Sequence, residues 1–236
     1  FIIPSDCPRS SPATQRVSSR RPPAATTCIS SSIRATTALP YQLFGYENHL
    51  SPDDHFQNLM RLIQAVAGRA HRISVIMPSL YGGRQHRRVS RESLDCAFAL
   101  QQLRDVGVKN IITFDAHDPR VMNAVPTMSF DNVMPTYQVL KCLLHHVPDV
   151  SFHKDNFMIV SPDEGAMNRN MYYSSVLGCN LGMFYKRRDY SRIVNGRNPI
   201  VAHEYLGESV EGKDVFIADD IIASGESMLD IAYELK

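Results

Sequence analysis

From about residue 50 onward, short apolar segments alternate with segments of helical periodicity, and this alternation limits the possible folds more than any other feature. Apolar runs indicate strands at Ile73–Met77, Asn110–Phe114, Phe157–Val160, Gly182–Tyr185 and Val215–Ala218. Amphipathic periodicity predicts helices over Asp54–Val66, Glu92–Leu103, Met134–His145, Met167–Leu177 and Ser227–Lys236. Strands separated by helices are typical of parallel sheets covered by helices. The sequence therefore predicts an α/β architecture with two sheets and a break around Val147–Asp155.

The first 40 residues differ sharply in composition from the rest. They hold eight Ser, five Thr, six Pro and five Arg with a single acid, Asp6. This pattern fits an organelle transit peptide or translated non-coding sequence, and the lack of a periodic apolar face favours the second. We expect residues 1–40 to be a disordered or non-native leader.

Charge and cysteine content exclude several functions. With 25 Lys and Arg against 24 Asp and Glu, the formal net charge is +1, which predicts no general attraction to nucleic acid or membrane. No apolar run reaches the roughly 18 residues that a membrane-spanning helix needs. The cysteines have neither C-x-x-C nor zinc-finger spacing, which indicates reduced thiols in a cytoplasmic protein; they are Cys7, Cys28, Cys96, Cys142 and Cys179.

Charged side chains follow every predicted strand at its carboxyl end. The strand exits carry the segments 81–88 (YGGRQHRR), 115–117 (DAH), 161–165 (SPDEG), 186–188 (KRR) and 219–220 (DD). Ligands of open α/β sheets bind beyond the carboxyl ends of the strands. A single charged loop is commonplace, but five in succession predict a site for phosphate groups and metal.

The last of these exits is the most informative. Residues 214–227 (DVFIADDIIASGES) read as a strand, two carboxylates, a turn of small residues and a helix start. Carboxylates accept hydrogen bonds from sugar hydroxyls or bind a hard cation such as Mg²⁺. Backbone N–H groups at a helix N-terminus bind anions. The segment therefore predicts a site for a sugar phosphate, although Ser224 alone could be an ordinary helix cap.

The other exits permit more than one interpretation. Arg84 stands in a loop with Gly82 and Gly83, which suits a polyphosphate but also a basic surface or RNA patch. Asp115 and His117 could hold a cation through either side chain or both, and His117 alone could be structural. Lys186 and Arg188 share one face if their strand continues, which suits neutralisation of a phosphoryl group; a solvated basic turn is the alternative.

Taken in this order, the segments resemble ribose-phosphate pyrophosphokinase, the synthetase of phosphoribosyl pyrophosphate, from about Tyr41 to Lys236. The stretch Asp219–Ser227 is similar to the phosphoribosyl-pyrophosphate loop that this family shares with type I phosphoribosyltransferases. The synthetase in particular is indicated by Arg84-Gln85, Asp115-Ala-His117, Ser161-Pro-Asp163 with Gly165 and Arg169, and Lys186-Arg-Arg188.

The resemblance implies a role for each matching residue. Arg84 and Gln85 would contact ATP, and His117 and Asp163 would help to hold Mg²⁺. Lys186 and Arg188 would be catalytic. Ribose 5-phosphate would be bound by Asp219, Asp220, Ala223, Ser224, Gly225, Glu226 and Ser227. The implied reaction transfers the pyrophosphoryl group of Mg-ATP to ribose 5-phosphate, giving AMP and phosphoribosyl pyrophosphate for nucleotide biosynthesis.

The resemblance also implies two tandem phosphoribosyltransferase-like domains, each a parallel sheet flanked by helices. We expect an ATP-side domain over residues 41–147 and a ribose 5-phosphate-side domain over residues 148–236. Both would be incomplete, because the chain reads as an internal fragment; alone it would be inactive, and at full length we expect the family's hexameric homo-oligomer.

Two departures from the family pattern leave alternatives open. His86 stands where an acid is usual, and Ala223 replaces an acid in the phosphate loop, in the manner of a divergent bacterial branch. A catalytically silent regulatory homologue would account for both changes, whereas the retained Lys186 and Arg188 argue against it. A type I phosphoribosyltransferase would account for the last motif but gives no role to Arg84-Gln85.

Overall fold

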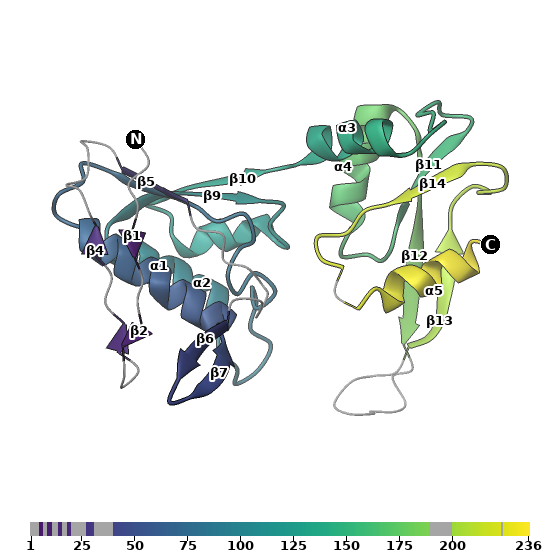
Figure 1. Cartoon of the computed structure of the whole chain (residues 1–236). Coiled ribbons are helices and arrows are strands. Elements are labelled where there is room, and N and C mark those ends of the chain that lie inside the picture. The colour runs from purple at the N-terminus through teal and green to yellow at the C-terminus, as the bar shows by residue number, and fades with distance from the viewer. Residues whose placement is uncertain are drawn as a thin grey trace. The chain divides into compact units, whose positions relative to one another are not determined.

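The computed structural model describes residues 5–6, 9–10, 14–15, 18–19, 27–30, 40–188, 200–222 and 224–236. The chain divides into two compact units, Phe1–Pro135 and Thr136–Lys236. Each unit contains a four-stranded sheet with helices (Figure 1). The predicted α/β architecture with two domains is confirmed.

The sheet of the first unit is parallel throughout, with the strand order β10-β9-β8-β5. Its strands are β5 (Thr27–Ser30), β8 (Ile73–Ile76), β9 (Val108–Phe114) and β10 (Ser129–Val133). Strand β5 lies within the stretch expected to be a leader, so the domain begins before residue 41. Its four residues, with Thr27 and Ser30 on either side of a Cys-Ile pair, are too few to show a strand period.

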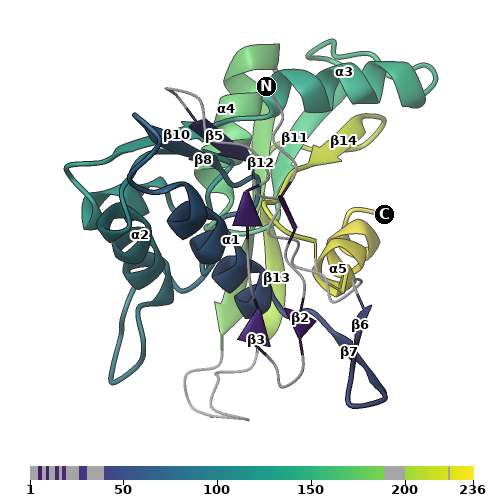
Figure 2. The same cartoon turned by 60° about the vertical axis from the view of Figure 1, so that its left-hand side comes forward.

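Helices α1 (Pro52–Val66) and α2 (Asp95–Asp105) lie side by side in this unit (Figures 1 and 2). Helix α1 starts at a capping box, in which the Ser51 hydroxyl accepts a bond from the Asp54 N–H and the Asp54 carboxylate accepts one from the Ser51 N–H. Apolar residues of both helices and of β8 and β9 form one core; its fully buried members include Ile63, Val75 and Ile111.

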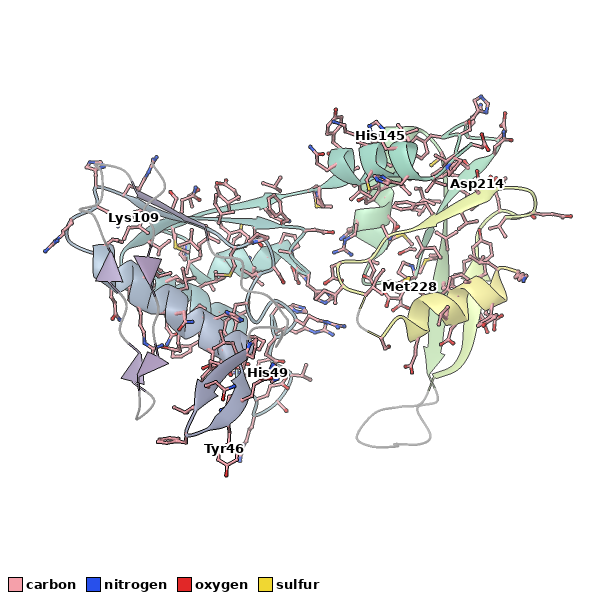
Figure 3. All side chains as sticks on the ribbon, in the orientation of Figure 1. Tyr46, His49, Lys109, His145, Asp214 and Met228 are labelled. Atoms are coloured by element: carbon pink, nitrogen blue, oxygen red, sulfur yellow. The ribbon has the colours of Figure 1, made fainter. Side chains whose placement is uncertain are left out.

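Shorter elements complete the first unit. A 3₁₀ helix η1 (Pro119–Ala124) follows β9, and an antiparallel hairpin joins β6 (Pro40–Leu43) to β7 (Tyr46–His49). Figure 3 shows Tyr46 at the tip of this hairpin, pointing outward. Two antiparallel pairs of two-residue strands precede it: β1 (Ser5–Asp6) with β4 (Ser18–Ser19), and β2 (Arg9–Ser10) with β3 (Thr14–Gln15).

The sheet of the second unit has the order β13-β12-β11-β14 and is mixed. Strands β11 (Phe157–Ser161), β12 (Asn180–Arg188) and β14 (Asp214–Ile217) are parallel, whereas β13 (Ile200–Leu206) runs antiparallel to β12. Strand β13 was not expected, and its pairing extends β12 beyond Tyr185 to Arg188. The prediction of a sheet exit at Lys186 was wrong, since residues 186–188 belong to the strand.

Helices cover both faces of this sheet (Figure 2): α3 (Thr136–His146), α4 (Met167–Leu177) and α5 (Glu226–Glu234). The central strand β11 is buried on both sides, because its side chains alternate between two cores. Phe157 and Ile159 pack with residues of α3 and α4, whereas Met158 and Val160 pack with Ile231 of α5.

The boundary between the units falls at Pro135 and Thr136, not at residues 147 and 148 as expected. Helix α3 belongs to the second unit, because its Leu140 packs in a core with Phe157 and Tyr173. A helix next to a boundary carries no sequence signal that says which sheet its apolar face will cover.

Candidate active site

The loop after β8 is built from successive tight turns. The Gly83 N–H donates to the Leu80 carbonyl at 3.0 Å, and the Gln85 N–H donates to the Gly82 carbonyl at 2.8 Å. Gly82 has φ +67°, and a Cβ atom there would lie 3.0 Å from the Cys96 backbone nitrogen in the first turn of α2. Glycine is therefore required both for the left-handed backbone and for the close approach to α2.

The two residues of this loop that are expected to contact ATP have different environments. Arg84 is exposed, as a side chain that contacts a ligand would be. The Gln85 amide group donates to the Ser93 carbonyl at 3.1 Å, so it stabilises the loop itself. Gln85 would have to exchange this bond to contact a nucleotide through its Nε2.

Beside this loop, His86 and His117 lie edge to face, with ring centroids 5.1 Å apart. His86 Nε2 is 3.6 Å from the Asp118 carboxylate, which also receives a two-pronged contact from Arg120. These hydrogen bonds from Arg120 lower the pKa of Asp118 to about 2. His86 Nδ1 is buried and has no hydrogen-bond partner among the described residues.

A strained turn brings His117 to this position. Asp115 adopts φ +45°, which is unusual for a residue with a side chain. The turn is held by β10: the Asp115 N–H donates to the Val133 carbonyl at 3.1 Å, and the Ala116 N–H donates to the Asn132 side chain at 2.9 Å. The segment after β9 therefore reverses sharply at the carboxyl edge of the sheet.

In the second unit, the two carboxylates after β14 lie beside a buried arginine. Arg169 Nη1 is 3.6 Å from Asp219 Oδ1 and 3.9 Å from Asp220 Oδ1. Arg169 lies on α4 and is only 8% exposed. A buried charge is costly unless it is paired, and the carboxylate pair meets that need.

The pKa of Asp219 is shifted in the folded chain. Burial is the main cause that raises the pKa of Asp219, to about 6, and a hydrogen bond with Asp220 raises it further. The negative charges of Asp220 and Asp163 act in the same direction. The charge of Asp163 thus contributes to the raised pKa of Asp219.

Asp163 also organises the start of α4. Its Oδ1 accepts the Ala166 N–H at 3.1 Å, and its backbone carbonyl accepts the Ser161 hydroxyl at 2.8 Å. Gly165 is confined by the same side chain, because a Cβ there would lie 3.2 Å from Asp163 Oδ1. Helix α4 begins at Met167, where the sequence predicted a helix.

The segment after the carboxylates enters α5 through a left-handed glycine. Gly225 has φ +82°, and its carbonyl accepts the N–H groups of Met228 and Leu229 at 3.0 Å. The Glu226 N–H points to the Ser224 hydroxyl at 3.4 Å. Ser224 and Glu226 are exposed, whereas Ala223 and the side chain of Ser227 lie outside the described residues.

Lys186 and Arg188 lie near the end of β12, opposite His203 and Ile200 of β13. The ladder shifts register between Arg187 and Arg188, so a bulge interrupts the strand between the two predicted catalytic residues. Their side chains are outside the described part of the chain, and their expected shared face stays a prediction.

No group of three or more His, Cys, Asp and Glu side chains among the described residues could hold a metal ion. This does not conflict with a magnesium role, because Mg²⁺ keeps several waters and takes one or two carboxylates together with substrate phosphates. His117 lies in the first unit and Asp163 in the second.

Sequence reasoning missed several residues that shape these sites. Asp118 contacts His86 and is itself bound by Arg120. Asn132 holds the turn after β9, and Asn170 binds Ala218 just after β14. None of them belongs to a short motif. Only the proximity of Asp118 to His117 in the sequence could have suggested its contribution.

The fold and the sites at the strand ends define a class: tandem α/β domains of the phosphoribosyltransferase type. One family model, the N-terminal domain of ribose phosphate pyrophosphokinase, matches residues 26–107, and the phosphoribosyl transferase domain matches residues 143–236. Ribose-phosphate pyrophosphokinases of Chlorobaculum tepidum and Agrobacterium fabrum are 26% and 28% identical over 187 residues, or 78% of this chain. Both units of the chain are therefore similar to domains of the ribose-phosphate pyrophosphokinase family.

A solved structure supports the fold. The crystal structure of phosphoribosylpyrophosphate synthetase from Mycobacterium smegmatis matches with a TM-score of 0.75 at 16% identity, over 100% of this chain and 68% of that chain. The alignments cover 54% and 56% of the two curated relatives, so the chain spans about half of their length. No helix in the described part of the chain is long and apolar enough to cross a membrane.

Proposed function

We propose that this chain belongs to an enzyme that transfers the pyrophosphoryl group of ATP to ribose 5-phosphate, giving 5-phosphoribosyl 1-pyrophosphate and AMP. The observation that carries the proposal is the Asp219–Asp220 pair, which Arg169 contacts at the end of β14. Two carboxylates at the carboxyl end of β14, beside the parallel strand β11, suit the vicinal hydroxyls of a ribose.

The second unit would bind ribose 5-phosphate. Ser224 and the left-handed Gly225 precede α5, so the 5-phosphate would lie against backbone N–H groups at a helix N-terminus. Ala223, Glu226 and Ser227 would line the same turn. Glu226 adds a negative charge in the first turn, which should weaken the binding of a dianion there.

The first unit would bind ATP. Arg84 is exposed in a loop that bends at Gly82, and a guanidinium group matches the geometry of phosphate oxygens. Gln85 would contact the nucleotide once its bond to Ser93 exchanges. His117 here and Asp163 in the second unit would be ligands of Mg²⁺, which when bound neutralises charge on the phosphates.

Lys186 and Arg188 would stabilise the charge that develops on the transferred group. Transfer of this kind depends mainly on positioning and on electrostatic stabilisation. We also propose a cytoplasmic, homo-oligomeric enzyme that acts without nucleic acid or membrane.

A direct test compares Lys186→Ala with Lys154→Ala in the native enzyme. Lys154 is an exposed lysine of the same unit and serves as the control. We expect Lys186→Ala to lower kcat for AMP release by about a hundredfold or more and the control to have little effect. Wild-type turnover in Lys186→Ala would contradict the assignment. An enzyme that binds both substrates without turnover would indicate the silent regulatory homologue.

A further inference from the structure

Asn170 of α4 is fully buried and connects three elements of the second unit. Its side-chain Nδ2 lies 2.9 Å from the Ala166 carbonyl, 2.9 Å from the Ala218 carbonyl and 3.3 Å from the Ser161 hydroxyl. Its Oδ1 accepts the Ala218 N–H at 3.3 Å. One carboxamide therefore satisfies both backbone groups of Ala218.

The contacts fix the orientation of this amide group. An amide nitrogen has two hydrogens, and the two shorter contacts to carbonyl oxygens use both. A flipped side chain would place Oδ1 against two carbonyl oxygens and leave the Ala218 N–H facing a donor. The arrangement thus requires an amide, because neither a carboxylate nor an aliphatic side chain can donate and accept in this way.

Ala218 lies at the point where strand pairing ends. The parallel ladder of β11 and β14 has Val160 opposite Ile217 as its last pair. The side-chain amide of Asn170 takes the place of a partner strand at the next residue, because it bonds both the N–H and the carbonyl of Ala218. Asp219 and Asp220 follow directly, so Asn170 fixes the direction in which the chain delivers the two carboxylates.

We propose that Asn170 is a positioning residue for ribose 5-phosphate, acting through the backbone of Ala218 on the Asp219–Asp220 pair. The inference rests on the proposed function and adds to it a residue that does not touch the substrate. Its neighbour Arg169 contacts the two carboxylates themselves. Two consecutive residues of α4 therefore hold the segment after β14: Asn170 binds its backbone, and Arg169 contacts its side chains.

The test measures AMP release by the native enzyme as each substrate is varied. Asn170→Leu keeps a similar volume and removes the hydrogen bonds, and Asn168→Ala is the matched control on an exposed position of the same helix. We expect KM for ribose 5-phosphate to rise about tenfold in Asn170→Leu, with KM for ATP changed by less than about twofold. A general loss of stability would not separate the two substrates in this way.

An unchanged KM for ribose 5-phosphate in folded Asn170→Leu would overturn the role of Asn170. Should this variant fail to fold, Asn170→Ser serves for the same measurement, since its hydroxyl still donates one bond. If both variants fail to fold, amide hydrogen exchange is measured on the unmodified protein. An Ala218 N–H that is protected as strongly as the amides of β14 supports its hydrogen bond to Asn170, and fast exchange of this N–H refutes it. An unmodified enzyme that releases no AMP would instead contradict the proposed function.

Discussion

At the scale of single residues, Arg169 counters the charge of two adjacent carboxylates while it is itself buried. Replacing it with methionine keeps most of the volume and removes the charge. We expect KM for ribose 5-phosphate to rise about tenfold to a hundredfold, because the two carboxylates lose the positive charge that counters their mutual repulsion. Steady-state kinetics check this, with Lys213→Met as the control, since Lys213 pairs with the exposed Glu208.

Asp219 gives the second residue-scale prediction, a dependence on pH. Its pKa rises from 3.8 to about 6 in the folded chain, so the fold favours the protonated form. The group stabilises the fold below about pH 3.8, and this contribution is lost as the pH rises through about 6. Ribose 5-phosphate should bind more weakly below pH 6, because a protonated carboxyl accepts hydrogen bonds less well.

The urea midpoint, measured as a function of pH, checks the effect on stability. The urea midpoint of the wild type should fall between pH 4 and pH 6 relative to that of Asp219→Asn, which lacks the titrating group. Asp230→Asn, at an exposed position of α5, should follow the wild type. Equal pH profiles for the wild type and Asp219→Asn would show that Asp219 titrates normally.

At the scale of elements, the pairing of β12 with β13 depends on close packing around Tyr205. A Cβ atom on Gly182 would clash with the Tyr205 hydroxyl, which itself donates a 2.8 Å hydrogen bond to the Glu208 carbonyl. Gly182→Ala should therefore destabilise the protein by about 1–3 kcal/mol, as overpacking of a core does. Denaturant unfolding checks this, and a Tyr205→Leu background should remove most of the effect. If the effects of Gly182→Ala and Tyr205→Leu on the free energy of unfolding were additive in the double variant, the clash would be ruled out.

The elements also show what the sequence could and could not predict. Helix α4 was predicted at its observed bounds, Met167–Leu177, and Gly178 ends it in a left-handed conformation. Strand β5 was missed, since it is short and lies in a Ser- and Thr-rich stretch. Strand β13 was missed because it depends on pairing with β12, which no local pattern records. Long-range pairing of this kind overrides local propensity.

The candidate site, like the fold, was predictable only in part. Asp219 and Asp220 were found because two acids after an apolar strand form a local pattern. Asn170 was not, since a helical asparagine gives no sign of a contact 48 positions away. Sequence motifs thus identified groups suited to the ligand, whereas the side chains that position them appear only in the folded chain.

At the scale of the whole molecule, each of the two units carries its own set of candidate binding residues. The first carries the Arg84 loop and the His86–Asp118 pair, and the second carries the Asp219–Asp220 pair. A type I phosphoribosyltransferase would need only the second set. The match of residues 26–107 to the N-terminal domain of ribose phosphate pyrophosphokinase favours a function that uses both.

The most direct test follows the phosphorus atoms of the reaction. The native enzyme is incubated with Mg²⁺, ribose 5-phosphate and ATP, and ³¹P NMR monitors the products. The account predicts AMP and phosphoribosyl pyrophosphate in equal amounts, with the β-phosphorus of ATP attached to the ribose 1-oxygen and no AMP when ribose 5-phosphate is omitted. Formation of ADP, or release of AMP without ribose 5-phosphate, would contradict it.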